Sequence, residues 1–132
     1  DHLDRVLVRL GHDDRISTIV AQRELQQAAA GLYVATGALE DWVRNPTGRG
    51  VAGDCEREWR ALGLRKQAYR SEILDMAATG RMTSEEAGVR LDAMRWLLRM
   101  AHHVWRLAHH LELAQQRDIA QTEGGAAEHE AD

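Results

Sequence analysis

The sequence predicts an all-α domain, an antiparallel up-down bundle of three long helices preceded by a short N-terminal helix. The composition favours helix, because the chain has one Pro, no Phe and many Ala, Leu, Arg, Glu and Gln. Apolar residues recur every three or four positions along most of the chain. Capping and turn signals separate these apolar stripes. With 132 residues, of which 44% are hydrophobic and 29% charged, a single globular domain is expected.

The first two predicted helices lie before residue 45. The short one covers residues 1–10, and its apolar stripe consists of Leu3, Val6, Leu7 and Leu10. Asp13 and Asp14 can cap the next helix, which is predicted over residues 14–44. Its apolar stripe shifts phase near Gln22 and Arg23. The sequence therefore predicts either one long helix or two helices separated by a kink.

A glycine-rich loop separates the second helix from the third. The loop is predicted over residues 45–53 and contains one proline and three glycines. We expect Asp54 to cap a helix over residues 54–79. Gly80 is expected to follow the end of that helix, where a left-handed backbone conformation favours glycine.

The last long helix is predicted over residues 83–116. Thr83 and Glu86 form a capping-box pattern at its start. Beyond it, residues 117–132 contain two adjacent glycines and an excess of carboxylates, which is typical of a disordered tail. The predicted organisation is therefore a helical bundle over residues 1–116 and an acidic disordered tail over residues 117–132.

Charge and residue content exclude several classes of function. Five carboxylates and one arginine in the tail account for the net charge of −4, so residues 1–116 are neutral. A neutral body favours no nucleic-acid partner. No apolar run approaches the roughly 20 residues of a membrane-spanning helix, so no direct membrane insertion by this segment is expected. Cys55 is the only cysteine, which excludes an intrachain disulfide, and its apolar stripe predicts burial.

Recognisable catalytic patterns are missing from the sequence. There is no G-x-S-x-G motif, and the serines lie in predicted helices. No acid–base or nucleophilic groups occur at a recognisable spacing, so we expect a protein without enzymatic activity and without a cofactor. The chain starts at Asp1, without Met and inside a helical pattern. We therefore expect a fragment of a longer protein, in which a membrane segment could precede Asp1.

The last helix carries two histidine doublets. On a helical wheel of about 100° per residue, its core face predicts burial of Leu98, Ala101, Trp105 and Ala108. His102 and His109 lie on the rim of that face and are weak candidate metal ligands. Their separation of about 10.5 Å along the axis means that one ion would need ligands from another helix. Arg99, His103 and Arg106 lie on the polar face and are a weak candidate anion site. The alternative is that all five side chains are simply solvated.

Two segments of the chain share a short pattern. The pattern H-[LV]-x-R-[VL] occurs at residues 2–6 and again at residues 103–107, which suggests an internal repeat. The first ten residues and residues 91–111 resemble helix segments of the PhoU-like domains found in bacterial sodium–phosphate cotransporters. The resemblance covers these two stretches, while residues 16–80 match only in helical pattern and length.

The resemblance implies a repeated three-helix bundle and, in some members, a multinuclear metal cluster held by E-x-x-x-D carboxylates. At the second repeat of this sequence, Trp105 and His109 stand where the two carboxylates would be. At the first repeat Asp4 is kept, but Val8 replaces its partner. We therefore expect no structural metal, and no cofactor of any other kind.

The function that the resemblance implies is a non-catalytic regulatory or assembly domain of a sodium-dependent phosphate transporter. Such a domain would lie on the cytoplasmic side of the bacterial inner membrane. Its partner would be the transmembrane part of the same transporter polypeptide, and an exposed half-bundle could also form a homodimer. The alternative is a free-standing helical module for protein interaction, or one that responds to metal or phosphate.

Overall fold

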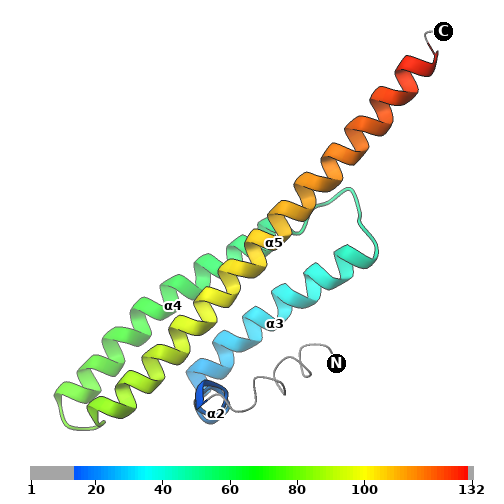
Figure 1. Cartoon of the computed structure of the whole chain (residues 1–132). Coiled ribbons are helices and arrows are strands. Elements are labelled where there is room, and N and C mark those ends of the chain that lie inside the picture. The colour runs from blue at the N-terminus through cyan, green and yellow to red at the C-terminus, as the bar shows by residue number, and fades with distance from the viewer. Residues whose placement is uncertain (1–13, 131–132) are drawn as a thin grey trace.

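The computed structural model describes residues 14–130, and these residues form four helices packed together, with no strand among them. The helices are α2 (Asp14–Ala21), α3 (Arg23–Arg44), α4 (Ala52–Ala78) and α5 (Ser84–Glu130). Figure 1 shows α4 and α5 side by side, with α3 along the pair and α2 beside the start of α3. The predicted all-α class is confirmed. The predicted N-terminal helix over residues 1–10 lies outside the described residues.

The predicted phase slip near Gln22 is a break between two helices. Gln22 has φ −117° and ψ 122°, an extended conformation that ends α2 and starts α3. Its carbonyl already accepts a hydrogen bond from the amide of Gln26 at 2.9 Å. Because the backbone turns here, Ile19 of α2 and Leu25 of α3 can both be buried although they are six residues apart. The alternative of two helices with a kink is therefore confirmed.

The turn between α4 and α5 follows the predicted glycine signal. Gly80 has φ 75°, the left-handed conformation that glycine adopts without steric cost. Its amide donates to Ala77, and the amide of Arg81 donates back to Met76 at 2.9 Å. This pair of bonds satisfies the last carbonyls of α4 in the pattern of a Schellman motif.

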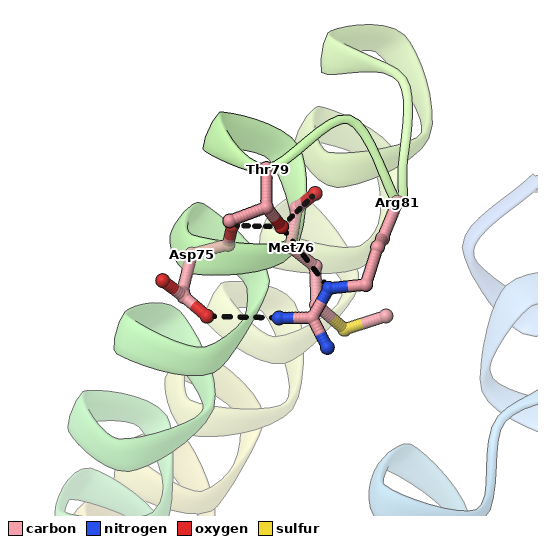
Figure 2. A network of polar contacts seen from close by, with 4 residues as sticks. All are labelled: Asp75, Met76, Thr79 and Arg81. Atoms are coloured by element: carbon pink, nitrogen blue, oxygen red, sulfur yellow. Dashed lines mark hydrogen bonds and ion pairs between the residues drawn. The ribbon is translucent and has the colours of Figure 1, made fainter.

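Side chains reinforce the same turn, as Figure 2 shows. The hydroxyl of Thr79 donates to the carbonyl of Asp75 at 2.9 Å and accepts a hydrogen bond from Arg81 Nε at 3.0 Å. A terminal nitrogen of Arg81 then pairs with the Asp75 carboxylate at 3.1 Å. All three side chains are exposed, so the network adds only modestly to stability.

The start of α5 keeps half of the predicted capping box. Thr83 Oγ1 accepts a hydrogen bond from the amide of Glu86 at 3.1 Å. The Glu86 carboxylate does not complete the box, because it accepts a hydrogen bond from Arg90 at 2.6 Å, one turn further along the helix. An ion pair four residues apart on a helix surface competes directly with the reciprocal cap.

The start of α4 differs from the prediction. The helix begins at Ala52, two residues before the expected cap at Asp54. The amide of Ala52 donates to Glu112 Oε1 of α5 at 2.7 Å. A carboxylate at a helix N-terminus satisfies a free amide and opposes the helix dipole. Glu112, 60 positions further along the chain, therefore caps α4 in place of Asp54. Asp54 instead pairs with Arg57.

The core consists of two clusters along the bundle. One cluster joins all four helices and includes the fully buried Leu25, Ile73, Met94 and Leu97. The other lies nearer the loop that links α3 to α4 and includes Leu39, Trp42, Cys55 and Ala108. Small residues on α5 support this packing, since Ala93, Ala101 and Ala108 are at most 2% exposed and let neighbouring helices approach closely.

The predicted core face of α5 is only partly correct. Ala101 and Ala108 are buried as expected. Leu98 and Trp105 are only half-buried and pack against the edges of the two clusters. The physical reason is that the buried arc of α5 runs through Met94, Leu97, Ala101 and Ala108, and Leu98 and Trp105 lie at its edge.

The C-terminal boundary is also different from the prediction. Helix α5 was expected to end near Gln116 and to be followed by a disordered tail, but it continues to Glu130. Residues 117–130 contain three Ala and three Glu and no Pro. Adding residues to an existing helix avoids the cost of nucleation, so two glycines do not stop it. None of the described helices combines the length and apolar character needed to cross a membrane.

Candidate functional site

The histidines of α5 take part in a ladder of stacked rings. We call Trp59, His102, Trp105 and His109 the ring ladder. Trp59 of α4 stacks on Trp105 with ring centroids 5.0 Å apart and an interplanar angle of 13°. His102 contacts both tryptophans, at 4.8 Å and 5.6 Å, and His109 also stacks on Trp105 at 5.9 Å. Aromatic contacts at these distances contribute roughly 0.5–1.5 kcal/mol each.

The ladder keeps the two candidate metal ligands apart. The ring of Trp105 contacts both His102 and His109. The two imidazoles therefore pack against the same indole, and no contact joins them to each other. The described residues contain no group of three or more His, Cys, Asp or Glu that could hold a metal ion. His103 and His110 point to the exposed side of the helix, each beside its neighbouring histidine.

The candidate anion site on the polar face is not hollowed. Arg99, His103 and Arg106 are all exposed. His103 lines a largely apolar groove on the α3 side, whereas Arg99 and Arg106 line none of the cavities described below. No cavity that the structure describes is lined by all three side chains.

A different set of cationic side chains, not predicted from the sequence, lines a cavity. We call it the basic groove, a solvent-open hollow of about 800 Å³ between α4 and α5. Its cations are Arg60, Lys66 and Arg70 of α4 and Arg95 of α5, and Leu91 and Leu98 contribute apolar surface. Arg60 pairs with Glu56 at 2.8 Å, while Lys66, Arg70 and Arg95 have no ion pair with any residue that the structure describes. No carboxylate lines the groove.

An apolar groove lies on the opposite flank of α5. It has a volume of about 620 Å³, and residues from three helices line it, including Ile16, Leu32, Tyr33, Trp96, Met100 and Leu107. Tyr33 and Leu107 are more than half exposed. The basic groove and the apolar groove therefore give the two flanks of the same helix opposite chemistry.

Cys55 behaves as a structural thiol. Its side chain is 1% exposed, and Sγ lies 3.8 Å from the carbonyl oxygen of Ala35. Burial raises the pKa of the Cys55 thiol to about 11, and the carboxylates of Asp54, Glu112 and Glu58 add to the effect. A thiol with such a pKa is almost wholly protonated near neutral pH and is a poor nucleophile or metal ligand. The predicted burial of Cys55 is confirmed.

The basic groove was missed because its residues come from two helices. A signal is present within α4, where Lys66 and Arg70 are four residues apart and share one helix face. In the sequence Lys66 only interrupts an apolar stripe, and the position of Arg95 against it depends on how α4 and α5 pack. Only the helix pairing brings the four cations to one hollow.

Comparisons with known proteins assign no relative to this chain. No protein-family model, no curated protein and no solved structure matches it. The PhoU resemblance rests on the sequence stretches alone, and the first of them, residues 1–10, lies outside the described residues.

Proposed function

We propose that this protein is a non-catalytic assembly or regulatory domain that works by binding another polypeptide. The observation that carries the proposal is the second half of α5, residues 112–130, which continues beyond the other helices in Figure 1. Leu113 is 36% exposed and Ile119 is 50% exposed on this part of the helix. A helix of this kind offers a side surface against which a second polypeptide can pack.

Energetics favours the same interpretation. A helical segment that buries no side chain against other helices gains little stability from packing, and the bond of Glu112 to Ala52 ties down only its first residue. Its side chains gain no burial from the bundle, because residues 113–128 contain no buried residue. A partner that packs against the segment would supply the burial that stabilises most helices in proteins. Binding would be opposed only weakly by backbone conformational entropy, since the segment is already helical before it binds.

The finer form of the proposal is a PhoU-like antiparallel up-down domain of a sodium-dependent phosphate transporter. Such a domain would lie on the cytoplasmic side of the bacterial inner membrane, next to the transmembrane part of the same polypeptide. The resemblance of residues 91–111 supports it. The competing form is a free-standing interaction module that is unrelated to transport or that responds to metal or phosphate.

Site-specific photo-crosslinking in the native cells tests the proposal. A photoreactive amino acid replaces Ile119, and the matched control replaces Val34, which is 63% exposed on α3. We expect a defined crosslink to a polypeptide at position 119 and little at position 34. Equal crosslinking at both positions, or none at position 119, would contradict the proposal.

The coding sequence upstream of Asp1 separates the two finer forms. Membrane-spanning segments encoded directly before Asp1 would support the transporter domain. A reading frame that starts close to Asp1 would instead support the free-standing module. Either result leaves the crosslinking experiment valid, because that experiment asks only whether a polypeptide covers the second half of α5.

A further inference from the structure

The basic groove and the ring ladder form one continuous face of the α4–α5 pair. On α4 Trp59 of the ladder lies one turn before Gly63 of the groove, and on α5 His102 follows Leu98 by one turn. All the residues that line the groove come from α4 and α5, so neither α2 nor α3 covers this face. The groove has three cations without an ion pair to a described residue and three leucines, which fits an elongated anionic ligand that also has apolar side chains.

The chain itself contains a segment of that chemistry. Residues 119–130, which we call the acidic segment, contain Glu123, Glu128 and Glu130 and no Lys or Arg. The segment is helical, and Ile119 and Glu123 are four residues apart on one helix face. Side chains 119–128 are exposed, so the bundle to which the segment belongs does not cover it.

The positions of groove and segment along α5 are compatible with reciprocal binding. On α5 the groove spans residues 91–98 and the acidic segment spans residues 119–130. The midpoint between them lies near His109, within the ring ladder. If a second α5 is laid head to tail on this face with a two-fold axis near His109, each acidic segment reaches the groove of the other copy. The overlap from residue 91 to residue 128 is about 56 Å of helix.

One face of α5 carries the residues of the groove and of the ladder that such an arrangement uses. The members of this stripe follow each other at steps of four, three, four, seven and four, and are Leu91, Arg95, Leu98, His102, His109 and Leu113. In the head-to-tail arrangement, Leu113 of one copy comes to the level of Trp105 and Arg106 in the other. An apolar and aromatic centre with charged pairs at both ends is the composition of a stable interface.

We propose that a second copy of this chain binds across the α4–α5 face, with the acidic segment of each copy seated in the basic groove of the other. The proposal rests on the proposed function and names its partner. Because each copy gives and receives the same contact, the two-fold arrangement closes as a dimer and leaves no free groove for a third copy. Opposite charges also favour this head-to-tail register over a parallel one, in which grooves would face grooves.

Charge reversal in the full 132-residue chain tests the proposal. Lys66→Glu with Arg70→Glu reverses the groove, and Glu123→Lys with Glu128→Lys reverses the acidic segment. Arg23→Glu with Arg44→Glu is the matched control, because both arginines are exposed on α3, away from the face. All six side chains are exposed or half-buried, so the fold is expected to persist, and circular dichroism of each variant checks it.

Sedimentation equilibrium measures the outcome. The original chain and the control are expected to dimerise, with the dissociation constant rising at least about tenfold between roughly 0.05 M and 0.5 M salt, as screening predicts. Each reversed variant alone is expected to be monomeric. A mixture of the two reversed variants restores both contacts at once, because a positive segment meets a negative groove and a negative segment meets a positive groove. The mixture is therefore expected to dimerise again.

Several results would overturn the proposal. The original chain could stay monomeric at low salt, at protein concentrations up to about 0.5 mM. The charge reversal of the groove could leave the dimer intact. The mixture of the two reversed variants could remain monomeric. Groove-dependent binding to vesicles with an anionic lipid, by a chain that stays monomeric, would assign the groove to a membrane surface instead. If the chain is monomeric but still crosslinks from position 119 to another protein in cells, the dimer proposed here is wrong. The proposed function is then still supported.

Discussion

The two halves of α5 have the same secondary structure and very different environments. In residues 84–111, Ala93, Leu97, Ala101 and Ala108 are at most 2% exposed and contact the other helices. In residues 112–128 no side chain is buried. The first half is therefore held by packing, and the second half is held by helix propensity and by its covalent continuity with the first. The difference separates residues that determine the fold from residues that are free to bind.

Truncation of an apolar side chain in each half gives the largest expected contrast. Leu97→Ala removes a fully buried side chain and is expected to lower the free energy of unfolding by roughly 2–5 kcal/mol. Leu113→Ala, in the second half, is expected to change it by less than about 0.5 kcal/mol in the monomer. Urea titration at low protein concentration measures both values. Similar losses for the two variants would show that the second half of α5 is packed.

The titration of the Cys55 thiol measures how well the core cluster around Leu39, Trp42 and Ala108 is packed. Because the folded pKa of about 11 lies above the ordinary value of 9.0, stability from the protonated thiol is complete below pH 9. It is lost as the pH rises from 9 through 11, by roughly 2–3 kcal/mol at most. The free energy of unfolding of the original chain and of Cys55→Ala, measured at pH 9 and pH 11, isolates this contribution. A pH dependence that is the same in the two proteins would refute it.

Alkylation gives an independent measurement of the same thiol. At pH 8 iodoacetamide is expected to modify Cys55 at least about a hundredfold more slowly in the native protein than in urea, because both burial and the raised pKa suppress the thiolate. Rapid native modification would place Cys55 outside the core.

Glu112 marks the boundary between the two halves and is expected to have an intermediate effect. Glu112→Ala removes the acceptor for the amide of Ala52 and is expected to cost roughly 0.5–2 kcal/mol, as for the loss of a helix cap. Glu112→Gln keeps an acceptor oxygen and is expected to retain part of the stability. Gln116→Ala, one turn further along, serves as the control. If Gln116→Ala lowered the midpoint of thermal unfolding as much as Glu112→Ala, Glu112 would not be a cap of α4.

Glycine replacement tests the comparison with the smallest effects. Gly88 lies in the packed half and Gly125 in the other half, and a Cβ at either position meets no atom within 4 Å. Gly88→Ala is expected to raise the free energy of global unfolding by roughly 0.5–1 kcal/mol. Gly125→Ala is expected to increase helix content, measured by circular dichroism, while global stability stays the same. A shift of the unfolding midpoint by Gly125→Ala would show that the two halves unfold together.

Particular residues show how far sequence reasoning reached. The glycine at Gly80 and the cap at Thr83 follow from local backbone preferences, and both occur where the sequence predicts them. The break at Gln22 is one of the two alternatives that the phase slip of the apolar stripe left open. The end of α5 was predicted too early, because two glycines and several carboxylates suggested disorder although the local helix propensity is high. The half-burial of Trp105 was also not foreseen, since a helical wheel shows one face and does not show how many neighbours share it.

The sequence by itself determined the all-helical class, the positions of the turns and the burial of Cys55, Ala101 and Ala108. These features depend on contacts within a few residues or on the apolar period of one helix, and both are present in a linear chain. Only the tertiary structure decided that Glu112 caps α4, that Trp105 separates His102 from His109, and that four cations of α4 and α5 share one groove. Each of these depends on the rotation and axial offset of one helix against another. Those two quantities arise from side-chain packing across the interface and cannot be read from either helix alone.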